Sequence, residues 1–310
     1  MSSPDLPPAV PGERRNLQMP GRRLSYYADG PTSAADARPL LLVHSINAAG
    51  SAYEIKPLYE HYRRLRPVYA LEMPGFGYSD RRDEEYTPRI MTDAIHAMVD
   101  EIARLHGGGP IDALALSLSS EFLARAAGDT PQAFRSLALI SPSGFSQRGP
   151  RYDPPGTTRG RPGLLRFLRR PLWSRAIYRL LTTHASIRYF LRRTWGSANI
   201  DEGLAAYDFQ TARQQGARYA PYRFVSGFLF SGDIGGVYDS LEPPTWLVHG
   251  VRGDFVDYTY AVMVDGRPNW LRQVFQTGAL PHFEAPKDFI AAYDAFLSGA
   301  DAPRARNGGT

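Results

Sequence analysis

A serine flanked by small residues marks the part of the chain best suited to nucleophilic chemistry. Ser117 follows a strand-like apolar run at 113–116 and precedes a helix-like run at 120–127. A strand that turns at once into a helix strains its corner residue and pushes that side chain out, so the residues at −2 and +2 must be small. Glycine usually fills both places (G-x-S-x-G), and here Ala115 and Ser119 meet the same steric requirement. We predict that Ser117 is a nucleophile at such a corner; the alternative is a serine on a buried strand–helix junction.

A serine hydroxyl needs a base, which is commonly a histidine held by a carboxylate. On a parallel sheet, functional loops lie at the carboxyl ends of the strands. Asp254 follows the strand-like run that ends at Gly250, and His282 follows the next such run, just before the final helical segment. The order Ser117, Asp254, His282 is that of one known triad arrangement. We predict Ser117 as nucleophile, His282 as base and Asp254 as orienting acid.

Other residues compete for these roles or complete the site. Asp257 is a rival acid three residues after Asp254. Acyl transfer also needs donors for an oxyanion, and the backbone N–H groups of Leu118, at the helix start, and Ile46, in the loop after His44, are in the expected places. We predict that these two groups form the oxyanion hole.

Alternating strand and helix patterns position these residues. Unbroken apolar runs at 39–44, 67–71, 113–116 and 137–140 are typical of strands buried on both faces of a parallel sheet. Helical periodicity separates them at 53–65, 89–105 and 120–127. A hairpin around Pro20–Gly21 is expected before the first of these strands. The pattern predicts an α/β fold with a mostly parallel, doubly wound sheet and helices on both faces.

The alternation stops after the fourth of these runs and resumes near residue 243. Between them, helical patterns occur at 164–168, 173–181, 187–195 and 203–218, with no convincing strand. We predict a helical cap over 147–236 inserted after the sixth strand. The core is then 17–146 and 237–298, with a flexible arm over 1–16 and a flexible tail over 299–310.

Composition limits the class of protein. A chain of 310 residues is long enough for one large domain with an insertion or for two small domains, and 43% hydrophobic and 22% charged residues are typical of a globular protein. No apolar run approaches the length of a transmembrane helix, and the proline-rich start does not resemble a secretory signal. With no cysteine, disulfides, thiolate catalysis and cysteine-ligated metals are excluded. Without a cysteine or a secretory signal, we expect a cytoplasmic protein. No zinc-type spacing such as H-E-x-x-H occurs, so we expect neither a metal nor a cofactor.

The positive charge is unevenly distributed. The net charge is +5, and only Lys56 and Lys287 are lysines. Residues 148–200 carry twelve arginines and one acid, Asp153. Such a segment either forms a solvated surface or meets an anion, for example a substrate carboxylate or phosphate, or an anionic membrane surface. We expect no nucleic-acid partner, and a small ester-like molecule as substrate.

Several motifs together resemble the α/β-hydrolase superfamily over roughly residues 20–298. They are L-V-H-S at 42–45, E-M-P-G-F-G-Y-S at 72–79, the Ser117 corner, the Gly250–Asp254 segment and P-H-F-E at 281–284. The resemblance is closest to cap-bearing members, and it implies the same three roles for Ser117, His282 and Asp254. Three positions depart from the family pattern, because Ser45, Ala115 and Ser119 replace glycines. A serine at the corner argues against the dehalogenase and epoxide hydrolase members, which use aspartate there.

The leading hypothesis is a serine hydrolase that forms an acyl-enzyme on Ser117 and acts on a carboxylic ester or thioester. The many aromatic and leucine residues of the cap suit a partly apolar substrate. One alternative uses the same triad to cleave a carbon–carbon bond in a diketone-like compound. The other is a member of the fold that binds a ligand without catalysis.

Overall fold

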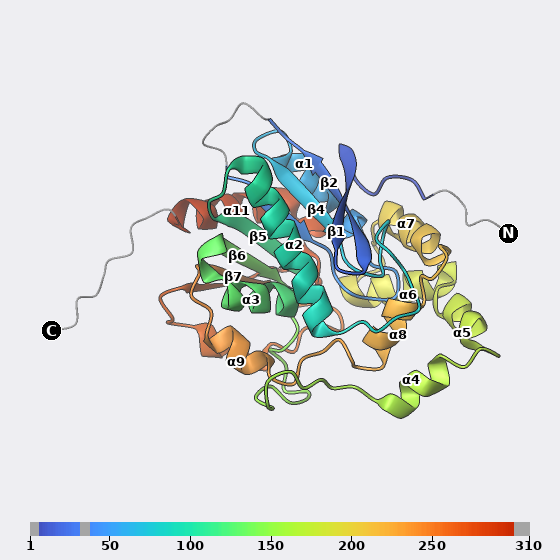
Figure 1. Ribbon diagram of the computed structural model, residues 1–310. Helices are drawn as coiled ribbons and strands as arrows, with labels where there is room; N and C mark the ends of the chain where they lie inside the picture. The colour runs from blue at the N-terminus through green and yellow to red at the C-terminus, as the bar shows by residue number, and fades with distance from the viewer. Residues whose placement is uncertain (1–5, 32–37, 301–310) are drawn as a thin grey trace.

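The computed structural model describes residues 6–31 and 38–300, and an eight-stranded sheet runs through this part of the chain (Figure 1). The strand order is β1-β2-β4-β3-β5-β6-β7-β8. β1 pairs antiparallel with β2 and β2 antiparallel with β4, whereas all other neighbours are parallel. The predicted α/β class and mostly parallel sheet are confirmed. The strands are β1 (Glu13–Met19), β2 (Arg22–Asp29), β3 (Leu40–Val43), β4 (Val68–Glu72), β5 (Ile111–Leu116), β6 (Phe134–Ile140), β7 (Thr245–His249) and β8 (Trp270–Val274).

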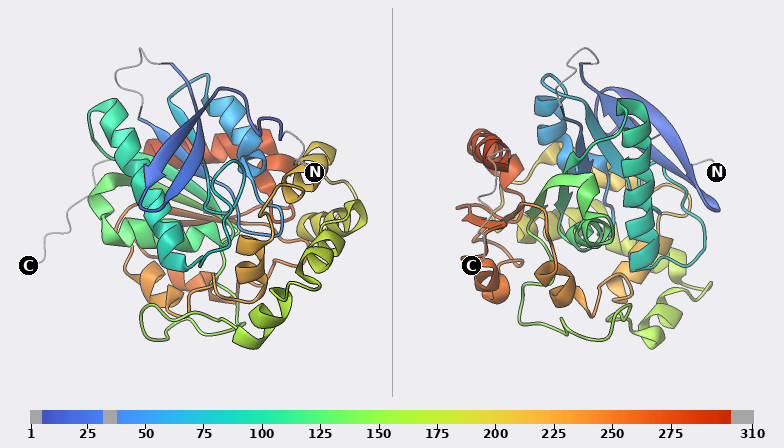
Figure 2. Two further views of the ribbon diagram at one scale, coloured as in Figure 1. Left: turned by 45° about the vertical axis from the view of Figure 1, so that its right-hand side comes forward. Right: turned by 60° about the vertical axis from the view of Figure 1, so that its left-hand side comes forward.

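Both faces of the sheet are covered by helices. Successive residues of a strand point to opposite faces, so Leu41 packs in one apolar cluster and Leu42 in another. The first cluster includes apolar residues of α2 (Pro88–His106) and α3 (Ser119–Asp129). The second includes residues of α1 (Lys56–Tyr62) and α11 (Pro286–Ala300). Figures 1 and 2 show these two helix pairs on opposite sides of the strands.

A set of helices lies between β6 and β7 in the chain and gathers on one side of the molecule (Figure 2). Most of the expected helical segments are present, but the helix expected at 203–218 ends at Ala212, residues 213–218 form turns, and a separate helix begins at Tyr219. None of the helices in the described ranges combines the length and apolarity needed to cross a bilayer. These helices are α4 (Pro162–Leu168), α5 (Ser174–Leu181), α6 (His184–Trp195), α7 (Glu202–Ala212), α8 (Tyr219–Val225) and α9 (Ile234–Asp239).

Short helices complete the connections close to the ends of the strands. The 3-10 helix η1 (Ala52–Ile55) precedes α1, and the four-residue helix α10 (Pro281–Glu284) precedes α11. Two other 3-10 helices are η2 (Pro131–Ala133) and η3 (Thr259–Val264). Both η1 and α10 place site residues.

The N-terminal segment differs from the expected flexible arm over 1–16. Residues 1–5 lie outside the described part of the chain, but Leu6, Ala9 and Val10 are buried in the apolar cluster that contains α1 and α11. The backbone N–H of Ala9 donates to the hydroxyl of Tyr27 at 3.0 Å. β1 then begins at Glu13. Apolar residues scattered among prolines show no periodicity, so this docking is decided by tertiary packing. The tail expected over 299–310 begins within α11, and residues 301–310 lie outside the described chain.

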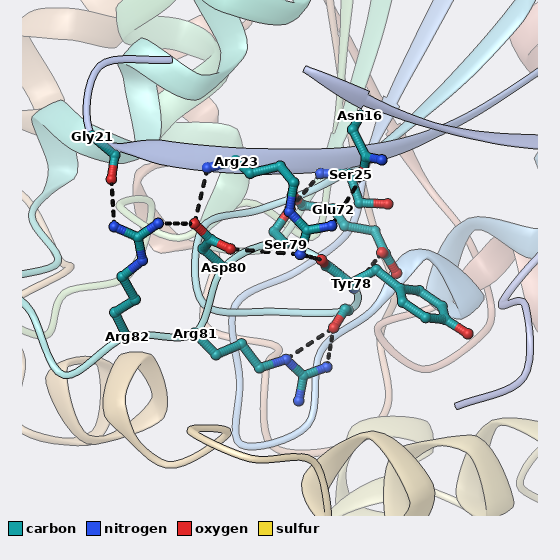
Figure 3. A network of polar contacts seen from close by, with 11 residues as sticks. Asn16, Gly21, Arg23, Ser25, Glu72, Tyr78, Ser79, Asp80, Arg81 and Arg82 are labelled. Carbon is teal, nitrogen blue, oxygen red and sulfur yellow. Dashed lines mark hydrogen bonds and ion pairs between the residues drawn. The ribbon is translucent and has the colours of Figure 1, made fainter. Parts of the chain in front are cut away.

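A polar network ties the segment after β4 to the N-terminal hairpin (Figure 3). The backbone N–H of Ser25 donates to Ser79 Oγ at 2.9 Å, and Ser79 Oγ donates to the carbonyl oxygen of Glu72 at 2.5 Å. The buried Glu72 carboxylate accepts from Tyr78 N at 2.5 Å. A Cβ at Gly77, whose φ is +50°, would collide with that carboxylate. The turn therefore requires glycine there.

Arg81 continues this network toward the helices between β6 and β7. Its Nε donates to the carbonyl oxygen of Gly77 at 2.9 Å. Two of its other nitrogens donate to the carbonyl oxygen and the hydroxyl of Thr211 on α7, at 2.8 and 2.9 Å. The β4 turn therefore fixes α7 against the sheet, and α7 is adjacent to η1 in the candidate site.

Candidate functional site

The corner between β5 and α3 places Ser117. Its φ is +51°, a left-handed conformation that is uncommon for a residue other than glycine. Its backbone N–H donates to the carbonyl oxygen of Ile140 on β6 at 2.8 Å. Ala115 and Ser119 are both fully buried, in agreement with the requirement for small residues on either side. The strain predicted for this corner is present.

A cavity of about 330 Å³ opens in front of this corner. It is lined from the carboxyl ends of five parallel strands, as expected for a sheet of this kind. Each strand contributes a residue that follows its last position: Ile46 after β3, Ser117 after β5, Ser141 after β6, Asp254 after β7 and Ala279 after β8. The segment between β6 and β7 supplies apolar lining from Leu191, Leu204 and Phe224 on helices and from Phe230 in the loop after α8.

The loop after β3 carries the predicted oxyanion donor Ile46. His44 holds the start of this loop, because its buried ring accepts from Met73 N at 3.0 Å and contacts the carbonyl oxygen of Ser45 at 2.6 Å. Burial lowers the pKa of His44 to about 4, so the ring stays neutral. Ile46 lines the cavity with Ser117, and Leu118 follows Ser117 directly. The two residues expected to donate are therefore one that lines the same cavity as Ser117 and one that follows Ser117 in the chain.

His282 does not reach Ser117 or Asp254 in this structure. It is the second residue of α10, and its ring is fully buried against Phe283 and Phe289, with centroids 5.1 and 5.8 Å away. Its Nε2 lies 2.8 Å from the carbonyl oxygen of Glu54. Because a carbonyl oxygen only accepts, Nε2 carries the proton, and Nδ1 has no partner within the described residues. Burial lowers the pKa of His282 to about 4.

The two candidate acids both line the cavity. Asp254 forms an ion pair with Arg193 of α6, and its backbone N–H donates to the carbonyl oxygen of Arg193 at 3.0 Å. Asp257 accepts from the Thr259 hydroxyl at 2.8 Å, and this hydrogen bond is the largest cause that lowers the pKa of Asp257. The structure thus brings Ser117 together with Asp254 and Asp257. It does not place His282 within hydrogen-bond distance of any of them.

Glu54 is a buried acid that sequence reasoning did not identify. It belongs to η1, lines the same cavity as Ser117 and is 4% exposed. Its carboxylate accepts from Ser45 N at 2.7 Å and from Asn47 Nδ2 at 2.5 Å. Burial is the largest influence on its pKa and raises it. No motif marks this residue, because it lies at the start of an ordinary amphipathic helical pattern.

Residues that could hold a metal ion do not gather in the described chain, where no group of three or more His, Asp or Glu side chains has a suitable arrangement. His249 is 7% exposed, and its ring stacks on Tyr258 with a centroid distance of 4.1 Å. Because Tyr258 lines the cavity, His249 packs behind the cavity wall. It has no contact with Ser117 among the interactions of the described residues.

Comparison with known proteins agrees with this architecture. A family model described as the α/β-hydrolase fold matches residues 38–286. A sequence search of the curated proteins finds no significant match.

Three solved structures illustrate the similarity. One is a serine hydrolase involved in carbazole degradation, with 18% identity, a TM-score of 0.70 and coverage of 92% of this chain and 98% of that one. Another is a meta-cleavage product hydrolase from Pseudomonas fluorescens, with 17% identity, a TM-score of 0.68 and coverage of 93% and 98%. A third is a carboxylesterase from Bacillus subtilis, with 16% identity, a TM-score of 0.65 and coverage of 93% and 92%. At these identities the likeness shows the fold.

Proposed function

Because the chain belongs to the α/β-hydrolase fold family, we propose that it hydrolyses a carboxylic ester or thioester through an acyl-enzyme on Ser117. The observation that carries this proposal is the strained Ser117 corner at the wall of a cavity beside Ile46. The Ser117 oxygen attacks the carbonyl carbon, and the leaving group departs with a proton. Water then releases the acid from the ester on Ser117. The N–H groups of Ile46 and Leu118 stabilise the oxyanion.

The cavity lining supports a partly apolar substrate. Leucine and phenylalanine side chains from the helices between β6 and β7 face the cavity, and in this proposal these helices act as a cap. Arg148 and Arg159 add positive charge to the same lining. A carboxylate or phosphate elsewhere on the substrate would find its partner there. Outside the cavity, the arginine-rich surface of the cap is proposed to contact anionic lipid.

The sequence assigns the base to His282 and its orienting acid to Asp254, and both assignments remain proposals. They require the His282 ring to give up its hydrogen bond to the carbonyl oxygen of Glu54 and to form one with the Ser117 hydroxyl instead. They also require Asp254 to leave Arg193 for the imidazole.

A second candidate function is ligand binding without turnover. It is favoured by one observation: the described residues that line the cavity include no histidine. A protein of this kind would keep the apolar cavity and its polar rim for recognition. It would not form a covalent bond at Ser117.

Ser117→Ala tests the proposed function. We expect loss of fluorophosphonate labelling, and a fall in kcat on the order of 10⁶ on p-nitrophenyl esters and thioesters of graded chain length. Asp254→Ala is expected to cost less, ~10⁴. Mass spectrometry of the labelled peptide identifies the modified residue. Unlabelled wild-type protein that still binds its ligand would support the binding function instead, and turnover of diketones alone would indicate carbon–carbon cleavage.

A further inference from the structure

The described residues before β1 dock on the fold although they form no helix or strand. We call residues 6–12 the N-terminal strap, and Figure 1 shows its start beside α7. Its apolar side chains Leu6, Ala9 and Val10 are buried. The N–H of Ala9 donates to the hydroxyl of Tyr27 on β2 at 3.0 Å. A buried segment without secondary structure must find such partners for its backbone on neighbouring elements.

Two further tyrosine hydroxyls hold the strap by its carbonyl oxygens. The hydroxyl of Tyr207 on α7 donates to the carbonyl oxygen of Pro7 at 2.8 Å. The hydroxyl of Tyr78, in the turn after β4, donates to the carbonyl oxygen of Leu6. The strap therefore connects α7, a helix from the segment between β6 and β7, to the β4 turn and to β2.

The same tyrosine of α7 also packs on η1. The ring of Tyr207 stacks on the ring of Tyr53 in η1, with centroids 5.2 Å apart and an angle of 28° between the planes. Ala52 and Ile55, the other apolar residues of η1, are fully buried in the apolar cluster that contains the strap residues and Tyr207. One side chain thus links the strap to this short helix.

η1 in turn holds the imidazole. The carbonyl oxygen of Glu54 in η1 accepts the Nε2–H of His282 at 2.8 Å. This is the hydrogen bond that His282 must give up before its ring can serve Ser117 in the proposed mechanism. A 3-10 helix of four residues has few hydrogen bonds of its own, so its position depends on the elements that pack against it. Whatever keeps η1 in place therefore also keeps the imidazole in place.

We propose that the docked N-terminal strap holds His282 away from Ser117 and so restrains the proposed active site. This inference rests on the proposed acyl-enzyme function. With the strap docked, Tyr207 packs on η1, and the carbonyl oxygen of Glu54 retains the imidazole. When the strap detaches, α7 and η1 lose this support and the hydrogen bond to the imidazole opens more often. The ring is then available to take the proton of the Ser117 hydroxyl.

The test compares three tyrosine-to-phenylalanine variants of the full chain. Tyr207→Phe and Tyr78→Phe each keep the ring and remove one hydroxyl that donates to the strap. Tyr62→Phe is the matched control, because its hydroxyl donates instead to Asp294 of α11, at 2.8 Å. Like Tyr207, Tyr62 belongs to the apolar cluster that contains the strap residues.

Two readouts follow the imidazole and the nucleophile separately. The first is the exchange of the His282 Nε2–H with solvent, measured by NMR on a resonance assigned through its loss in His282→Gln. A buried, hydrogen-bonded N–H exchanges only when the structure around it opens. The second is the rate of Ser117 labelling by a fluorophosphonate. The first readout needs no catalysis.

We expect the His282 N–H to exchange about fivefold faster in Tyr207→Phe and in Tyr78→Phe than in wild type, the factor for one lost hydrogen bond. The double variant should exchange about 25-fold faster, because the two hydrogen bonds come from different elements. Labelling of Ser117 should accelerate in the same order. Tyr62→Phe should stay within about twofold of wild type in both readouts. Exchange as fast in Tyr62→Phe as in the strap variants would show general loosening of the fold and overturn the inference.

The remaining outcomes separate this inference from the proposed function. Unchanged exchange of the His282 N–H in both strap variants would overturn the inference, whatever the labelling rate. Faster exchange without faster labelling would also overturn it, provided that the wild type is labelled at Ser117. Absence of labelling in the wild type and in both strap variants would instead overturn the proposed function. Faster imidazole exchange in those unlabelled proteins would still support the hold of the strap on His282.

Discussion

At the scale of single residues, burial shifts the pKa values of neighbouring acidic and basic side chains in opposite directions. A carboxylate out of water holds its proton more tightly, and an imidazole out of water holds it less tightly. Glu54 and His282 are both buried and lie within one hydrogen bond of each other. Burial therefore raises the pKa of Glu54 and lowers that of His282 to about 4. The environment makes the acid a better base and the histidine a poorer one.

Burial also raises the pKa of Glu72, and this shift makes the stability of the protein depend on pH. Burial is the largest cause that raises its pKa, from 4.5 to about 7. The folded state therefore resists ionisation of Glu72, and the stability linked to this carboxyl is fully present below pH 4.5 and lost as the pH rises to about 7. In wild type, this carboxyl lowers the free energy of unfolding by on the order of 3 kcal/mol as the pH rises between these limits. We predict that Glu72→Gln removes this decrease.

Urea unfolding at several pH values measures this difference. Glu54, Asp208 and Glu121 also have raised pKa values, so they add losses of the same sign that persist in the variant. The quantity of interest is therefore the difference in slope between wild type and Glu72→Gln. Parallel curves for the two proteins would contradict the prediction.

At the scale of elements, the β8–α10 loop determines what faces Ser117 from this side of the cavity. The backbone N–H of Ala279 donates to the carbonyl oxygen of Thr194 at 2.9 Å, and its carbonyl oxygen accepts from Ser141 Oγ at 2.7 Å. A Cβ at Gly278 would collide with the backbone of Trp195. The loop is thus held between the end of β6 and α6, and the side chain at 279 is kept at the cavity wall.

Ala279→His should give Ser117 an imidazole from this loop. The cavity of about 330 Å³ has room for the ring. We predict that the variant hydrolyses p-nitrophenyl esters about tenfold or more faster than wild type, since a positioned base contributes ~10²–10⁴. Its pH profile should acquire a rise near pH ~6.5, the ordinary pKa of histidine. Ala279→Gln is the control of similar size without a base. Equal rates of ester hydrolysis for the two variants and wild type would show that a side chain at position 279 does not reach the Ser117 hydroxyl.

At the scale of the whole molecule, α4, α5 and α6 form an outer surface with unusual composition. No acidic residue occurs between Asp153 and Asp201. Leu172 and Leu180 are 87% and 70% exposed, and Phe167 and Phe190 are each about half exposed. Exposed apolar side chains among arginines are typical of surfaces that lie on anionic lipid. Figure 2 shows α4 and α5 at the periphery of the molecule, where such contact is sterically open.

Vesicle binding tests this surface. We predict that the protein co-sediments with vesicles containing phosphatidylglycerol more than with phosphatidylcholine alone, and that salt weakens the binding. Arg175→Gln and Arg179→Gln should each weaken it roughly fivefold, equivalent to about 1 kcal/mol per arginine near the surface. Arg64→Gln, at an exposed residue in the turn that follows α1, is the matched control. Equal binding to both lipid compositions, or equal loss in the control, would exclude this role of the surface.

Much of this molecule follows from short-range sequence patterns. Runs such as 40–43 and 113–116 are apolar at every position because both faces of a parallel sheet are buried, and so the strands and their order of connection are predictable. The Ser117 corner is equally local, since the small residues at 115 and 119 are within two positions of it. The placement of Ile46 and Asp254 at the same edge follows from the rule for the carboxyl ends of strands.

The sequence could not determine which side chain faces Ser117, because that depends on how three distant segments pack. The orientation of α10, a helix of four residues, turns His282 toward the backbone of Glu54 and leaves Ala279 at the cavity. The burial of Glu54 by α7 and the loop after β3 gives that residue its basicity, and no nearby pattern encodes it. Spacing along the chain thus defined the fold and the strained Ser117 corner, whereas solvent exclusion and hydrogen bonding in three dimensions decided the surroundings of that corner.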